Sequence, residues 1–175
     1  MSKSEKEMEI QYAIAKKIGR QNIVIPNVSF AWVSCRIPKY GADGRFIVYK
    51  YPFRGVRHEA DLIWINDNDY LTEVEIKTSY SDFLADFKKK EKHMTKYTRA
   101  VYYAFPWDIY KGNKEKIIKT LAEKFPEAGV IIVDMDGTVV RTLKNAEYFT
   151  VEKIPIEVKV GLMRIGCQKW WEWNA

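Results

Sequence analysis

The segment HEADLIWINDNDYLTEVEIKTS, residues 58–79, decides the fold that the chain is expected to adopt. Apolar side chains recur on both sides of residues 67–69, Asp-Asn-Asp, a combination that is typical of turns. The pattern predicts a β-hairpin. Because successive side chains of a strand point to opposite faces, Glu73, Glu75 and Lys77 lie on one face of its second strand.

The length of the turn predicts which residues of the two strands face each other. A three-residue turn places Ile65 opposite Leu71, and counting backward places Asp61 opposite Glu75. Like charges directly opposite in a sheet repel, so the two carboxylates either separate into water or hold a cation between their oxygens. Mg²⁺ suits the second arrangement, because it binds a few carboxylate oxygens and retains several waters. Lys77 would then lie beside one of those waters.

A solvated strand is the alternative interpretation of the same charges. Charged residues point outward in many antiparallel sheets, and Glu and Lys two residues apart are a common exposed pair. A register shift of one residue would also turn Asp61 to the other face. Glu73 is expected to have only a supporting or surface role.

The order of these residues resembles the D…(D/E)-x-K core of the PD-(D/E)XK nuclease superfamily, which has the restriction-endonuclease-like fold. Asp61 would be the first acid of this motif, and residues 75–77, Glu-Ile-Lys, would be its (D/E)-x-K segment. Residues 60–90 are similar to the MmcB-like DNA-repair branch, in which a strand ending in E-(V/I)-K-(S/T) precedes a Ser-Asp-Phe-Leu-x-Asp helix with lysines. The similarity extends from about Arg57 to Asp134. The family has a proline at the position of Ala60, which makes the motif less diagnostic here.

The resemblance implies a single α/β domain over residues 1–175, with a central mixed β-sheet flanked by helices. Its nuclease core would span about residues 5–140, followed by a C-terminal extension at about 150–175. The implied activity is that of a Mg²⁺-dependent deoxyribonuclease, with Mn²⁺ as a substitute ion. A role in repair, recombination or phage DNA processing would fit that activity.

The resemblance also implies a role for each motif residue. Asp61, Glu75 and the backbone carbonyl of Ile76 would hold one or two Mg²⁺ ions. Lys77 would position the attacking water. Asp61, Glu75 and Lys77 are thus the predicted catalytic residues.

An acid from the first helix often joins the metal site in this superfamily. The spacing from the helix-ending Gly19 resembles that of Holliday-junction resolvases and favours Glu9, with Glu5 and Glu7 as rivals. Glu9 is equally well explained as a first-turn acid that the helix dipole favours. The metal role of Glu9 is therefore an expectation with a simpler alternative.

A lysine-rich segment follows the hairpin. Ser81 is expected to begin a helix that continues to about residue 96, whose lysines would contact phosphates without sequence preference. His93 and Tyr97 have the spacing of the Gln-x-x-x-Tyr pair in exonuclease branches, and the alternative is a solvated helix face with a packed tyrosine. The predicted DNA contacts are Lys88, Lys89, Lys90, Lys92, His93, Lys96 and Tyr97.

Composition favours a nucleic-acid partner without proving one. The chain has 29 basic and 23 acidic residues, a formal net charge of +6. Cys35 and Cys167 lack the spacing of a metal or redox motif, which indicates reduced thiols and a cytoplasmic location. No apolar run approaches the length of a membrane span. The sequence is compatible with a monomer or a homodimer.

The remaining elements follow from periodicity and turn residues. The patterns predict helices over about residues 4–18 and 113–125, one or two strands within 22–50, a buried strand at 99–106, and two strands around 136–137.

A second motif competes with the nuclease interpretation. GVIIVDMDGTVV, residues 129–140, resembles the D-x-D-G-T signature of haloacid-dehalogenase-type phosphatases, with Asp134 as nucleophile and Asp136 as general acid. That family places the motif near the start of a Rossmann-like domain, so a hairpin with an Asp-Gly turn is the simpler account. A nucleic-acid-binding protein of nuclease-like fold without turnover is the other alternative.

Overall fold

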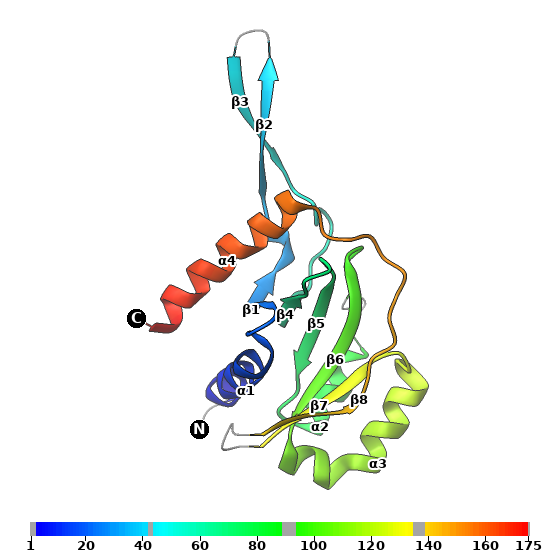
Figure 1. Ribbon diagram of the computed structural model, residues 1–175. Coiled ribbons are helices and arrows are strands. Elements are labelled where there is room, and N and C mark those ends of the chain that lie inside the picture. Colours follow the sequence, from blue (N-terminus) through cyan, green and yellow to red (C-terminus); the bar gives the residue numbers. More distant parts are fainter. Residues whose placement is uncertain (1–2, 42–43, 89–93, 135–138, 175) are drawn as a thin grey trace.

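The computed structural model describes residues 3–41, 44–88, 94–134 and 139–174 (Figure 1). A six-stranded sheet forms its centre, with the strand order β1-β4-β5-β6-β7-β8. The strands are β1 (Ile23–Ser29), β2 (Cys35–Gly41), β3 (Gly44–Lys50), β4 (Glu59–Ile65), β5 (Leu71–Ile76), β6 (Thr98–Pro106), β7 (Gly129–Val133) and β8 (Val140–Lys144). The helices are α1 (Lys3–Ile18), α2 (Tyr80–Asp86), α3 (Trp107–Lys124), α4 (Ile156–Asn174) and the short 3₁₀ helix η1 (Phe30–Trp32).

The directions of the strands make the central sheet mixed. β4 pairs antiparallel with β1 and β5, whereas β5, β6 and β7 run parallel and β8 returns antiparallel to β7. The ends of the three parallel strands, at Ile76, Pro106 and Val133, therefore meet at one edge of the sheet, which we call the carboxyl edge. β2 and β3 pair with each other and extend away from the central sheet (Figure 1).

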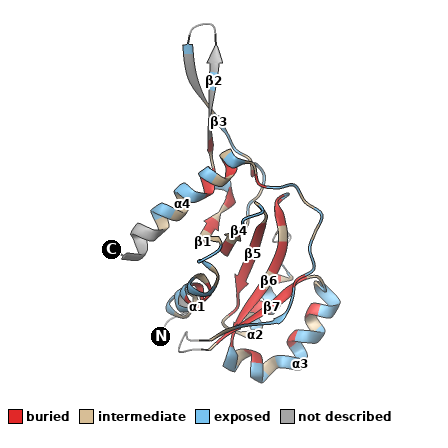
Figure 2. Ribbon diagram, viewed as in Figure 1, coloured by how far each residue is buried: buried red, intermediate tan, exposed pale blue. Residues whose placement is uncertain are grey.

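Helices cover both faces of the central strands, and for this reason β5 is buried along its whole length (Figure 2). On one face, α1 packs residues such as Ile14 against Val74 and Ile76. On the other face, α2 and α3 cover residues such as Tyr103 and Phe105 of β6. A polar side chain on β5 is therefore in a region of low dielectric constant, where charges interact strongly.

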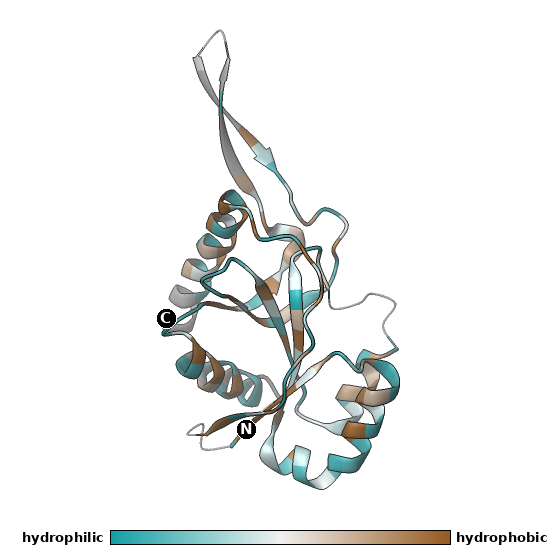
Figure 3. Ribbon diagram, turned by 45° about the vertical axis from the view of Figure 1, so that its right-hand side comes forward, coloured by the Kyte–Doolittle hydropathy of each residue, from teal (hydrophilic) through white to brown (hydrophobic). Residues whose placement is uncertain are grey.

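The helices owe their positions to amphipathic patterns. Figure 3 shows that α1 and α3 carry both hydrophilic and hydrophobic residues, as expected for helices that cover a sheet. α4 packs residues such as Val158 and Leu162 into a third apolar cluster with β1 and β4. Along the described parts of the chain, no helix combines the length and apolar character that a membrane crossing requires.

Several sequence predictions are confirmed, and others need correction. The first helix, the hairpin of β4 and β5, the buried strand β6 and the paired strands β7 and β8 are present. α2 ends at Asp86 instead of near residue 96, and its N-cap is Ser79, whose hydroxyl accepts the N–H of Asp82 at 3.1 Å, instead of Ser81. α3 begins at Trp107, before its predicted start, and contains a non-helical residue, Asn113, at the position where the prediction began. The helix α4 was not predicted.

Candidate functional site

The two predicted acids meet at the carboxyl edge of the sheet. β4 and β5 pair Ile65 with Leu71, Ile63 with Glu73 and Leu62 with Val74, which is the register that the three-residue turn predicts. The same register extended by one residue places Asp61 beside Glu75, whose charge acts on it. The Asp61 Oδ2 atom also accepts the backbone N–H of Ile76 at 2.7 Å, which ties the first acid to the end of β5.

The pKa of Asp61 depends on its burial and on the nearby charge of Glu75. Burial, followed by the negative charge of Glu75, raises the pKa of Asp61 to about 7, and the hydrogen bond from Ile76 opposes the shift only in part. Glu75 is 2% exposed. A cation bound beside the two carboxylates would favour the charged form of Asp61.

Lys77 lies between two acids just beyond β5. Its Nζ atom is 3.1 Å from Glu75 Oε2 and 3.1 Å from Asp86 Oδ1, and the residue is 4% exposed. Burial lowers the pKa of Lys77, but the charges of Glu75, Asp86 and Asp61 outweigh burial and hold the pKa above its ordinary value. Lys77 is therefore a fixed positive charge at neutral pH and not a proton acceptor.

Asp86 and Tyr103 complete the surroundings of Lys77. The Tyr103 hydroxyl donates to Asp86 Oδ2 at 3.0 Å, and its ring lies under Lys77, with Nζ 5.9 Å from the centroid. Burial and the charge of Asp86 raise the pKa of Tyr103, so the hydroxyl remains a donor. Neither residue was predicted as part of the site, although Asp86 is the last acid of the quoted Ser-Asp-Phe-Leu-x-Asp motif.

Helix α1 contributes Gln11 to the site. The Gln11 Nε2 atom donates to Asn27 Oδ1 and to the Asp61 carbonyl, both at 2.7 Å, and so links β1 to β4. Gln11 is buried, and its Oε1 atom has no hydrogen-bond partner among the described residues. An oxygen in that position is available to a water or a ligand near Asp61.

Of the three acids proposed from the first helix, the structure brings Glu7 and not Glu9 within electrostatic reach of Asp61. Glu7 lies one helical turn before Gln11, and its charge is among those that raise the pKa of Asp61. Glu9 is exposed, because two residues turn a helix by about 200° and place its side chain away from the sheet. Among the acids considered for the first helix, Glu7 is thus the one that acts on Asp61.

The donor set at the carboxyl edge matches an open site for a hard cation. Among the described residues, no group of three or more His, Cys, Asp and Glu side chains is arranged to hold a metal. Mg²⁺ does not need such a cage, since it commonly uses one or two carboxylates, waters and substrate phosphates. Asp61 and Glu75, with the Ile76 carbonyl, fit that requirement, whereas they do not fit a closed structural site such as that of zinc.

The predicted DNA contacts are only partly located. Lys88 is exposed just after α2, whereas Lys89, Lys90, Lys92 and His93 lie outside the described residues. Lys96 is exposed beside Glu152, two residues before β6, and β6 then extends about 26 Å to the carboxyl edge. Tyr97 is buried against Phe53 with ring centroids 5.6 Å apart, so its predicted phosphate contact is wrong. Helix α2, which was expected to carry His93 and Tyr97, already ends at Asp86.

Glu73 belongs to a second buried polar cluster, and its predicted surface role is wrong. The side chain is fully buried, and Oε2 lies 2.8 Å from His58 Nε2. The Thr98 hydroxyl donates to Oε1 and is paired with the Thr95 hydroxyl at 2.9 Å. His58 packs against Phe30 with ring centroids 5.1 Å apart. This cluster is enclosed by the apolar core.

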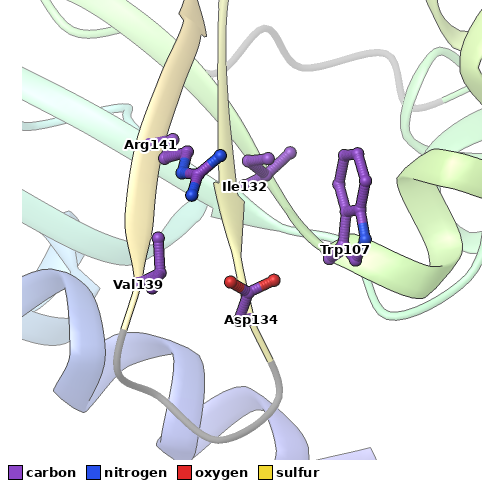
Figure 4. Close-up of a pocket in the computed structure, with 5 residues that line it drawn as sticks. All are labelled: Trp107, Ile132, Asp134, Val139 and Arg141. Carbon is purple, nitrogen blue, oxygen red and sulfur yellow. The ribbon is translucent and has the colours of Figure 1, made fainter.

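A pocket lies at the same edge of the sheet, between β7, β8 and the start of α3 (Figure 4). Its volume is about 200 Å³, and it is lined by Trp107, Ile132, Asp134, Val139 and Arg141. The Asp134 N–H donates to the Val139 carbonyl at 3.0 Å, so Asp134 lies where β7 ends beside the chain that enters β8. Asp136, the proposed general acid of the phosphatase alternative, lies outside the described residues.

Comparison with known proteins supports the fold and no more. No protein-family model matches the chain, and no curated protein is similar to it. A solved structure of a protein of unknown function from Silicibacter pomeroyi is similar, with a TM-score of 0.57 and 15% sequence identity over 95% of this chain and 87% of that one. At this level of identity the likeness concerns the α/β fold alone, and it extends over most of both chains.

Proposed function

We propose that the protein is a Mg²⁺-dependent deoxyribonuclease built on a restriction-endonuclease-like core. The observation that carries this proposal is the meeting of Asp61 and Glu75 across β4 and β5, with the Lys77 ammonium held 3.1 Å from Glu75. A mixed sheet that bears the acids on an antiparallel hairpin, and continues through a helix to the parallel strand β6, is compatible with the fold that the resemblance implies.

The residues have distinct roles in the proposed reaction. Asp61, Glu75 and the Ile76 carbonyl would hold Mg²⁺, and Glu7 would add negative charge from α1. When bound, the ion would stabilise charge on the phosphate oxygens of the substrate. These ligands lie on adjacent strands of one sheet, and rigid elements hold catalytic geometry better than loops.

Lys77 would orient the attacking water and stabilise the negative charge that develops at phosphorus. Because the neighbouring carboxylates raise its pKa, it would do so as a permanent cation. Asp86 would act as a positioning residue, since it binds the Lys77 ammonium at the same distance as Glu75 does, and Tyr103 would in turn hold Asp86. Lys77 would thus be shared between two acids, which leaves Glu75 available to the ion.

The test is a cleavage assay with isosteric variants. The wild-type protein is expected to cut supercoiled, linear or single-stranded DNA in Mg²⁺ or Mn²⁺ and to be inactive in EDTA. Asp61→Asn and Lys77→Met should each lower the rate by about 10²-fold or more. The matched controls are Asp67→Asn in the turn at the far end of the hairpin and Lys124→Met at the end of α3, both exposed.

Three outcomes would count against the proposal. Equal cutting by the wild-type protein and both site variants would show that a contaminant or another site is responsible. DNA binding without cutting in any metal would instead favour the nuclease-like binding protein. Metal-dependent release of phosphate from small phosphomonoesters, lost in Asp134→Ala, would favour the phosphatase.

A further inference from the structure

The pocket of Trp107, Asp134 and Arg141 lies on the same face of the sheet as Glu75, and not only at the same edge. Glu75 pairs with Tyr103, and Tyr103 pairs with Val130, so these three side chains share a face. Two residues further along, Phe105 pairs with Ile132, and Ile132 pairs with Arg141. Side chains two residues apart on a strand point the same way, so Ile132 and Arg141 share the face of Glu75.

The distance between the pocket and the acids follows from the strand order. β7, which carries Ile132 and ends before Asp134, lies two strands from β5. Neighbouring strands are about 4.8 Å apart and Ile132 lies two residues further along the sheet, so the pocket begins about 12 Å from Glu75. A DNA strand rises about 3.4 Å or more per nucleotide, so two or three nucleotides span this distance. One strand of DNA could therefore occupy the acids and the pocket together.

The lining of the pocket provides a flat aromatic surface next to polar groups. Trp107 is 41% exposed and stacks on Tyr110, with ring centroids 6.3 Å apart and an angle of 25° between the planes. One face of the indole is thus supported by the protein. Figure 4 shows the Asp134 carboxylate at the end of β7 and Arg141 on β8, with Ile132 between Arg141 and the indole. An aromatic platform with a planar cation is the combination that holds unpaired bases.

The size and charge of the pocket narrow the class of ligand. A volume of about 200 Å³ lies below the roughly 300–1,000 Å³ of pockets for drug-sized ligands and suits a single flat ring. A bare phosphate would meet the carboxylate of Asp134, whereas a base offers N–H donors to that carboxylate. Arg141 can then contact a phosphate of the same nucleotide.

We propose that this pocket binds one unpaired nucleotide of the DNA strand that the protein cuts, with its base stacked on Trp107. The inference rests on the proposed nuclease function and refines its substrate class, because a base in a continuous duplex is not free to enter the pocket. Single-stranded DNA, overhangs and frayed ends would be preferred to a blunt duplex. Asp134 would accept a hydrogen bond from the base, and Arg141 would hold the neighbouring phosphate.

Binding without cleavage tests the inference. Fluorescence anisotropy in EDTA, at one fixed salt concentration, would give the Kd of a labelled oligothymidylate and of a blunt duplex of equal length. Trp107→Ala should raise the Kd for the single strand about tenfold or more, and Trp107→Phe should raise it less, because a smaller ring still stacks. Arg141→Gln should raise it a few-fold. The duplex should bind more weakly and respond less to Trp107→Ala.

Matched controls are available at the opposite side of the sheet. Trp32 is 81% exposed and follows β1, the edge strand farthest from β8, and Arg20 is exposed before that strand. Trp32→Ala and Arg20→Gln should leave the Kd within about twofold of the wild-type value, as expected for surface positions remote from the ligand. Circular dichroism melting would show that all variants are folded.

Each outcome bears on the inference separately from the nuclease proposal. Unchanged single-strand binding by Trp107→Ala overturns the inference, as does a wild-type protein that binds no single-stranded DNA. An equal loss in Trp32→Ala overturns it too. Metal-dependent cutting that Asp61→Asn abolishes would leave the nuclease proposal intact in all three cases. Binding that depends on Trp107, in a protein that cuts nothing, would support the pocket and reject the nuclease.

Discussion

Glu73 and Glu75 are two buried acids on one strand, and the comparison between them shows how surroundings determine a role. They lie two residues apart on β5, point to the same face and are almost completely buried. Glu73 is surrounded by His58 and by the Thr98 hydroxyl inside the apolar core. Glu75 shares Lys77 with Asp86 and lies opposite Asp61 at the end of the strand.

The difference between the two acids lies in how their charge is used. Donors from His58 and Thr98 are directed at both oxygens of Glu73, which makes its cluster suited to holding strands β4, β5 and β6 together. Glu75 adds its charge to that of Asp61 and raises the pKa of that group. An excess of buried negative charge is costly for stability and is typical of sites that bind cations or perform chemistry.

The largest expected effect is a loss of cleavage activity that follows substitution of Glu75 and not of Glu73. Glu75→Gln should lower the kcat of DNA cleavage by about 10³-fold, because it removes a proposed metal ligand, while unfolding in urea changes by less than about 1 kcal/mol. Glu73→Gln, an equally conservative change on the same strand, is the control. If both variants lost activity equally while both remained folded, the division of roles between the two acids would be wrong.

The second prediction is that Glu73, unlike Glu75, contributes mainly to the stability of the fold. Glu73→Ala should lower the free energy of unfolding by about 3 kcal/mol, because it leaves His58 and Thr98 buried without their acceptor. Urea denaturation measures this change. The folded fraction should keep a kcat within a few-fold of wild type. A variant as stable as wild type would show that the cluster contributes nothing to the fold.

The pairing at the proposed site could be predicted from the sequence, because it depends on local rules. Alternation along the strand and the length of one turn are enough to place Asp61 opposite Glu75. The same rules placed Glu73 and Lys77 on the face of Glu75. They do not say whether that face is covered, since coverage depends on where α2 and α3 pack. For this reason the sequence left open whether Glu73 has a supporting role or a surface role.

The residues that sequence reasoning missed are brought together by packing between distant segments. Asp86 reaches Lys77 only because α2 folds back over the sheet, and Tyr103 comes from β6. The choice between Glu7 and Glu9 depends on the rotation of α1 about its axis, which packing against the sheet determines. Tyr97 was placed on a helix because the lysine-rich pattern continued beyond Asp86, whereas the chain there starts β6.

The third prediction extends the comparison to the partner of Lys77. Asp86→Asn should lower kcat by about tenfold with little change in KM, because the ammonium loses one of the two charges that hold it in place. The effect should be smaller than that of Glu75→Gln, since a positioning residue does not contact the reacting groups. Steady-state kinetics separate kcat from KM, and Asp82→Asn in the first turn of α2 is the control. A loss confined to KM would mean that Asp86 acts on DNA binding.

Tyr103→Phe is the smallest and most selective change. It removes the hydroxyl that donates to Asp86 and keeps the ring under Lys77. A hydrogen bond to a charged acceptor contributes about 1.5 kcal/mol, so stability should fall by about that amount and kcat by only a few-fold. In the Asp86→Asn background the effect of Tyr103→Phe on kcat should largely disappear, because Tyr103 acts on Lys77 through Asp86. Rate measurements on the single and double variants form a double-mutant cycle. Additive effects would show that the hydroxyl acts by another route, and the buried cluster around Lys77 would then not work as one unit.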